Sequence, residues 1–136
     1  MSNYENHIIY PTYQSILMNT IGTVIERMNN GETFSAWLAL RNLYRWLPGE
    51  VKAEVKPTHE KINQTLNQIK NQNIHLDYYL RRQETHKQQE KYLINMNEQF
   101  CDEISESLRK HNWLDRDATI KPRDQTMPTL KVKGRP

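Results

Sequence analysis

The stretch THEKINQTLNQIKNQNIHLDYYLRRQETHKQQEKYLINMNEQFCDEISESLRKHN, residues 58–112, decides how this chain folds. It contains no glycine and no proline, and Asn and Gln supply 14 of its residues. A segment of this length without helix breakers favours α-helix. Because its apolar residues are sparse, a helix formed here presents only a narrow apolar stripe to whatever it packs against.

The apolar residues of this stretch form two stripes with helical spacing, separated by a polar segment at 83–90. The first stripe follows the alternating steps of four and three that are typical of a coiled coil. Its members are Ile62, Leu66, Ile69, Asn73, Leu76 and Leu80. The second stripe consists of Leu93, Met96, Phe100, Ile104 and Leu108.

Two geometries fit these stripes. The lack of Gly and Pro favours one continuous helix, whereas the break between the stripes favours a helical hairpin that turns near 83–88. We place the hairpin slightly ahead, because it lets four helices share one core.

Two more helices are predicted upstream. Residues 11–29 carry apolar side chains at three- and four-residue steps and end at Asn29-Asn30-Gly31, a typical stop. The most apolar segment, 33–47, ends before Pro48-Gly49, and the residues that follow it, 50–56, fit a short strand and a helical turn equally well. The sequence therefore predicts an all-α protein of three to four helices, arranged as a bundle or a helical hairpin. The expected helices are about 11–29, 33–47, 58–82 and 88–112.

This helical domain, 11–114, is flanked by two segments of different character. Residues 1–10 are expected to form an extended arm whose aromatic and aliphatic side chains can pack on a neighbour. Residues 115–136 contain three prolines and are expected to be disordered alone. The net positive charge lies in this tail: residues 1–112 carry 13 Lys/Arg and 13 Asp/Glu, and residues 113–136 carry six and three.

Composition limits the class of protein and its compartment. A hydrophobic fraction of 36% and a mean hydropathy of −0.92 indicate an elongated shape, an oligomer or a partly unfolded chain. The opening MSNYENHIIY does not resemble a secretory signal, and no apolar run approaches the roughly 18 residues of a membrane span. The single cysteine, Cys101, excludes an internal disulfide. We expect a cytoplasmic protein, or a virion protein if it is viral, without membrane contact.

The chemistry-bearing residues do not form a recognisable catalytic or metal site. His86 and Glu90 have the spacing of two metal ligands on one helix face, but no second pair accompanies them, so a solvated surface is the better interpretation. Cys101 is followed by acidic residues that raise a thiol pKa, which predicts a buried structural thiol. With four glycines in total, no phosphate-binding loop is present. We predict no enzymatic activity, no cofactor and no metal.

Five residues are candidates for a protein interface. Trp46 lies at a helix end, off the apolar face, and Asn73 interrupts an aliphatic stripe at a position where a buried Asn can fix helix register. Tyr78 lies outside the stripe. Leu130 and Val132 alternate with cations in the tail and can dock on a sheet edge or in a groove.

The basic tail also predicts contact with nucleic acid. An extended strand would place its alternating cations on one side, toward phosphates. The candidate residues are Lys121, Arg123, Lys131, Lys133 and Arg135.

The preferred interpretation is a non-enzymatic interaction or structural protein, a subunit of a larger assembly that associates with itself or with a partner protein. A viral or phage protein is one concrete form of it. A small nucleic-acid-binding protein that uses the C-terminal tail is the alternative, and a metal-dependent helical enzyme ranks third.

Overall fold

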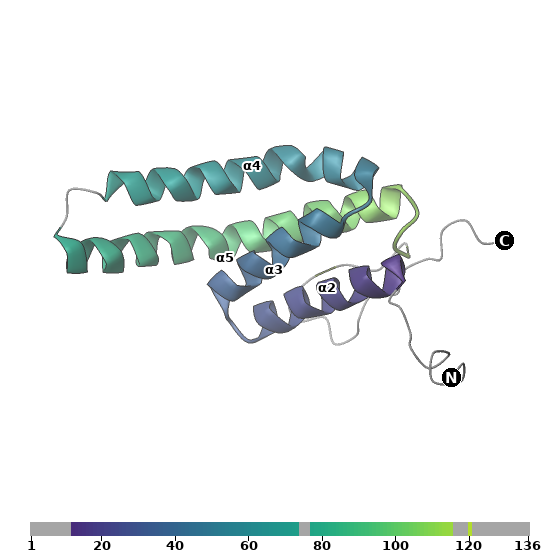
Figure 1. Ribbon diagram of the computed structural model, residues 1–136, viewed down its shortest axis with the longest axis horizontal. Coiled ribbons are helices and arrows are strands. Elements are labelled where there is room, and N and C mark those ends of the chain that lie inside the picture. The colour runs from purple at the N-terminus through teal and green to yellow at the C-terminus, as the bar shows by residue number, and fades with distance from the viewer. Residues whose placement is uncertain (1–11, 74–76, 116–119, 121–136) are drawn as a thin grey trace, which may run out of the picture.

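The computed structural model describes residues 12–73, 77–115 and 120. This part of the chain folds into four helices, which confirms the all-α class (Figure 1). They are α2 Tyr13–Asn29, α3 Thr33–Trp46, α4 Gly49–Gln72 and α5 Tyr78–Lys110.

The helices form two antiparallel pairs of unequal length. α2 packs on α3, the longer α4 packs on α5, and α3 contacts both long helices. In Figure 1 the α4–α5 pair extends well beyond the turn that joins α2 to α3. The shorter pair therefore covers only the proximal half of the α4–α5 hairpin, which includes the C-terminal end of α5.

Local chemistry explains the ends of the two short helices. The Thr12 hydroxyl accepts a hydrogen bond from the Ser15 amide at 3.1 Å and caps the start of α2. Gly31 ends the helix with a φ of +72°, a conformation that glycine adopts readily, and the Glu32 amide then bonds the Arg27 carbonyl at 3.0 Å. α3 ends at Trp46 because Pro48 holds the residue before it in an extended conformation.

α4 begins at Gly49 rather than near residue 58, so residues 50–56 are helical and not a strand. Val51 and Val55 are buried one turn apart. They extend the first apolar stripe, which was predicted to begin at Ile62, toward the start of α4. Pro57 lies within the helix and removes one backbone hydrogen bond. Pro57 and Ala53, whose carbonyl loses its partner, are both exposed, so water can replace the missing donor.

The hairpin turn comes earlier than the predicted 83–88. α4 ends at its C-cap Asn73, and α5 starts after Asp77, whose carboxylate accepts a hydrogen bond from the Tyr79 amide at 3.0 Å. The polar segment 83–90 is part of α5. Most of its side chains are exposed to solvent, and two of them also contact other helices: Gln88 bonds Asn73, and the His86 ring lies 4.4 Å from that of Phe34.

The core lies between the two pairs of helices and continues past the end of α5. Its largest fully buried side chains include Leu17, Ile21, Leu40, Leu43, Ile62, Phe100 and Ile104. Beyond α5, Leu114 and Ile120 are also buried. The Ile120 amide donates to the Ser105 hydroxyl at 2.8 Å, so this point of the C-terminal segment is attached to α5.

Among the described residues, no helix has both the length and the apolar character needed to cross a membrane. The predicted N-terminal arm, 1–10, lies outside the described residues. Of the predicted tail, 115–136, only residues 115 and 120 are described.

Candidate functional site

Burial of apolar side chains decreases along the α4–α5 hairpin toward its turn. On α4, Ile62 is fully buried, whereas Leu66 and Ile69 are only partly buried. On α5, Leu93 is fully buried, whereas Tyr79 and Leu80 are among the most exposed large apolar residues. Tyr79 is 67% exposed and Leu80 is 54% exposed. We call the half of the hairpin nearer its turn, residues 66–73 and 79–88, the distal hairpin; α3 reaches it at His86, whose ring lies beside that of Phe34.

A polar contact holds the two helices of the distal hairpin together. The Asn73 amide group donates to the Ile69 carbonyl at 2.8 Å and to the Gln88 side-chain oxygen at 2.9 Å. Asn73 is buried, with 5% of its surface exposed. This predicted interface residue therefore lies at a helix–helix contact within the chain, between the end of α4 and the first half of α5.

The other predicted interface residues are scattered. Trp46, 40% exposed, ends α3, and its carbonyl accepts a hydrogen bond from the Tyr13 hydroxyl. Tyr78 is the first residue of α5, but its side chain lies outside the described residues. Leu130, Val132 and the five predicted nucleic-acid contacts also lie outside them, namely Lys121, Arg123, Lys131, Lys133 and Arg135. The structure thus does not bring Trp46 and Asn73 into one site.

Basic side chains gather where α3 meets α4. The His59 ring of α4 stacks on Tyr44 of α3, with 4.0 Å between ring centroids and 6° between the planes. The Lys52 ammonium lies 5.5 Å from the centre of the Tyr44 ring. Arg41 and Arg45, one turn apart on α3, are close enough to act electrostatically on His59. We call Arg41, Arg45 and Lys52 the α3–α4 basic cluster.

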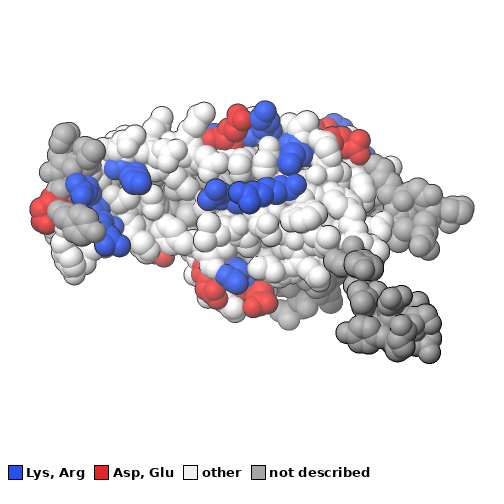
Figure 2. All heavy atoms as spheres, in the orientation of Figure 1, with Lys and Arg blue, Asp and Glu red and all other residues white. Residues whose placement is uncertain are grey.

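The environment of His59 favours its neutral form. Burial lowers the pKa of the imidazole, and the positive charges of Arg41 and Arg45 lower it further, while Glu60 opposes them. Figure 2 shows Lys and Arg side chains in a row across the middle of the visible face, with Asp and Glu toward its edges. The row lies in the region of α3. This face is therefore locally positive although the helical body is neutral.

A second polar network joins the start of α4 to the end of α5. Glu54 accepts hydrogen bonds from Ser107 at 2.6 Å and from Lys110 at 2.8 Å, and it lies 3.1 Å from the His111 ring. These contacts, led by Lys110, lower the pKa of Glu54 to about 2. The Glu54 carboxylate is thus neutralised by Lys110 within the network, which favours a structural role for these residues.

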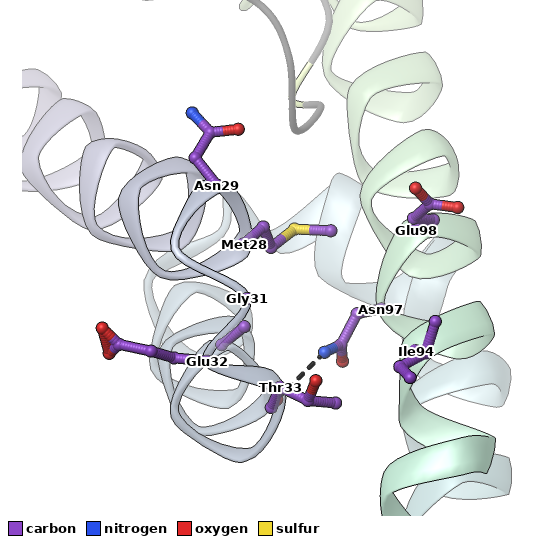
Figure 3. Close-up of a pocket in the computed structure, with 9 residues that line it drawn as sticks. Met28, Asn29, Gly31, Glu32, Thr33, Ile94, Asn97 and Glu98 are labelled. Carbon is purple, nitrogen blue, oxygen red and sulfur yellow. Dashed lines mark hydrogen bonds between the residues drawn. The ribbon is translucent and has the colours of Figure 1, made fainter.

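A cup of about 380 Å³ lies between the α2–α3 turn and α5 (Figure 3). Asn97, only 3% exposed, donates from its side chain to the Thr33 carbonyl at 3.1 Å, and its side-chain oxygen has no partner among the described residues. The side chain of Glu32 points away from the cup in Figure 3, while Glu98 lies on its α5 wall. The residues that line this pocket include Asn97, with its buried acceptor, Thr33 and Glu98.

The remaining reactive group is the thiol of Cys101. Cys101 is fully buried, as expected from its sequence context, and burial, Asp102 and Glu98 all raise its thiol pKa. Within the described ranges, no three His, Cys, Asp or Glu side chains are grouped so as to hold a metal ion. Sequence reasoning missed the Tyr44–His59 stack, the Glu54 network and the cup, because each joins residues from different helices.

Comparison with protein families, with curated proteins and with solved structures finds no match for this chain.

Proposed function

We propose that this chain is a non-enzymatic helical subunit of a larger assembly, and that the distal hairpin is the surface on which a neighbouring subunit packs. The observation that carries this proposal is the decrease in burial along α4 and α5. Both helices continue regularly toward the turn, but the apolar residues they present there are partly or largely exposed.

The physical reason is the geometry of a two-helix hairpin. Each amphipathic helix needs its apolar stripe covered, and a single partner helix covers only part of it. In the proximal half, α3 supplies the additional cover for α5. In the distal half a helix from another subunit can play the same part.

Tyr79 supports this choice of surface. It is a large aromatic residue and is mostly exposed. With Gln83 and His86, which follow it one and two turns later on the same helix, it lines a shallow pocket on the surface of α5. Exposed Tyr residues are common anchors at protein interfaces, because the ring buries much area at little entropic cost. The neighbouring Leu80 adds aliphatic surface.

The alternative proposal, nucleic-acid binding through the C-terminal tail, depends on residues outside the described part of the chain and stays a prediction. The viral or phage origin and the cytoplasmic or virion location also stay predictions. Trp46, partly exposed at the proximal end, is a candidate for a second contact in the same assembly.

Light scattering on the purified full chain, together with photo-crosslinking in its native source, tests the proposal. A photoreactive phenylalanine at position 79 should crosslink to another copy of the chain or to one defined protein. If the partner is a second copy, the purified chain should scatter as an oligomer, and Tyr79→Lys with Leu80→Lys should make it a monomer. The matched control is Ile94→Lys, because Ile94 is an exposed residue of α5 beside the α2–α3 turn.

Two outcomes would overturn the proposal. The first is a monomeric chain with no discrete crosslinked product from position 79. The second is an assembly that tolerates the paired lysine substitutions as well as it tolerates the Ile94 control.

A further inference from the structure

The α3–α4 basic cluster carries charge that the fold does not neutralise. None of Arg41, Arg45 and Lys52 forms an ion pair within the described part of the chain. Glu60, the carboxylate that acts on His59, lies 3.9 Å from Lys56 in a salt bridge of its own. Among the described residues, these three cations therefore surround the Tyr44–His59 pair without a salt bridge to a carboxylate.

The mutual repulsion of these cations slightly destabilises the surface, and a bound anion would relieve it. Like charges on neighbouring helical turns repel one another, and solution counterions only screen that repulsion. Residues 1–112 as a whole carry equal numbers of cationic and anionic side chains, 13 of each, so the cluster is a local feature of the surface and does not follow from the net charge of the helical part. A polyanion that binds here releases those counterions, which favours binding.

The platform beneath the cluster is rigid. His59 stacks on Tyr44, and its ring centroid also lies 5.9 Å from that of Trp37 and 6.1 Å from that of Phe100. Trp37 and Phe100 belong to the buried core. The arginines and Lys52 thus project from a surface whose backbone is fixed by the core, which lowers the cost of ordering them around a ligand.

We propose that the α3–α4 basic cluster binds the phosphodiester backbone of a nucleic acid, independently of base sequence. Arg41 and Arg45 lie one turn apart, about 6 Å along the helix axis. Their guanidinium forks suit phosphate oxygens, and a nucleic-acid strand repeats its charge at intervals of a few ångströms. His59 can add an uncharged N–H donor.

The same geometry explains the expected lack of base specificity. His59 and Lys52 already occupy the ring of Tyr44, so no base stacks on it. No helix of the cluster is free to enter a groove, because α3 and α4 pack on α5 and on each other. The contacts that remain are to the backbone.

Fluorescence anisotropy with a short labelled single-stranded DNA, and with an RNA of the same length, tests this proposal on the full chain. We expect affinity to fall steeply between about 50 and 200 mM salt and to be similar for different base sequences. Arg41→Gln with Arg45→Gln should weaken binding by about tenfold or more at low salt and should lower the salt slope by about one for each lost contact.

The matched control removes the same charge from another surface. Lys87→Gln with Lys91→Gln replaces two exposed lysines of α5, also one turn apart, and should reduce affinity much less. Thermal melts of both double variants verify the fold. In the NMR spectrum of the wild type, the His59 ring signals should shift on addition of DNA, whereas those of the exposed His86 should not.

Three results would overturn the proposal. One is an equal loss of affinity in the two double variants, which would indicate that binding depends on the net charge of the protein and not on the position of the two arginines. Another is binding that deletion of residues 121–136 abolishes and the arginine substitutions leave unchanged. The third is competition by polyglutamate as effective as that by unlabelled DNA, which would assign the cluster to an acidic protein surface.

Discussion

The two halves of the α4–α5 hairpin share the same helices but have different surroundings. In the proximal half, Val51 and Ile62 of α4 and Phe100 and Ile104 of α5 are all buried, and α3 packs on both helices. In the distal half, Asn73 bonds Gln88, and Tyr79 is exposed. Helix formation continues through both halves because it depends on local sequence, whereas burial depends on how far the neighbouring helices reach.

The largest expected effect tests the core of the proximal half. Phe100→Ala removes a fully buried ring that contacts Trp37 and His59, and should lower the free energy of unfolding by about 3–5 kcal/mol. Leu66→Ala, in the distal half, should lower it by less than about 2 kcal/mol, because Leu66 is already partly exposed. Urea denaturation of the two variants measures both values. Similar losses would show that the two halves are equally well packed in solution.

The next effect concerns the attachment of the C-terminal segment to the proximal half. Ser105 is fully buried, donates to the Cys101 carbonyl at 2.8 Å and accepts from the Ile120 amide. Ser105→Ala leaves that amide buried without an acceptor and should cost about 1–3 kcal/mol. Thr23→Ala is the control, because Thr23 is exposed and should change stability by no more than about 0.5 kcal/mol. A Ser105 variant as stable as this control would show that Ile120 does not dock at α5.

A smaller effect measures the polar contact of the distal half. Asn73→Ala and Gln88→Ala, combined in a double-mutant cycle, should give a coupling of about 0.5–1 kcal/mol. Hydrogen exchange should show that Asn73→Ala increases opening near the turn and leaves the protection of residues 93–108 unchanged. Additive single substitutions would mean that the bond between these two side chains does not contribute to stability.

The smallest effect is a pH dependence at the proximal end. The folded state holds the Glu54 pKa at about 2, below its usual value of 4.5, so it binds fewer protons there than the unfolded state. The resulting stabilisation is complete above about pH 5 and is lost as the pH falls toward 2. Because the site is solvent-exposed, the gain is modest. Melting temperatures of wild type and Glu54→Gln should differ near neutral pH and converge at about pH 2. A difference that persists there would indicate a cause other than the charge on Glu54.

The helical class and most helix ends follow from sequence patterns because their signals are local. The Asn29-Asn30-Gly31 stop and the Pro48-Gly49 break both end helices at the predicted places. The second apolar stripe of the long polar stretch is buried throughout, which confirms that its members face a core.

The hairpin turn was misplaced because the polar segment 83–90 resembles a break when it is considered alone. Its polarity reflects exposure to solvent within a continuous helix, and its contacts with Phe34 and Asn73 involve residues that are distant in the sequence. Asn73 at the end of α4 and Asp77 as the cap of α5 were the local signals of the true turn. Neither Gly nor Pro lies between them, so the sequence signal for a turn at this position was weak.

The sequence by itself determined the all-α class, the neutral helical body and the unusual character of Asn73, because helix propensity, charge and apolar spacing are properties of neighbouring residues. Only the tertiary structure decided which half of the hairpin is covered and where basic side chains meet. Tyr44 and His59 are far apart in the chain, and Asn73 meets Gln88 only across a turn. Such contacts depend on the lengths and packing of whole helices, which no local pattern contains.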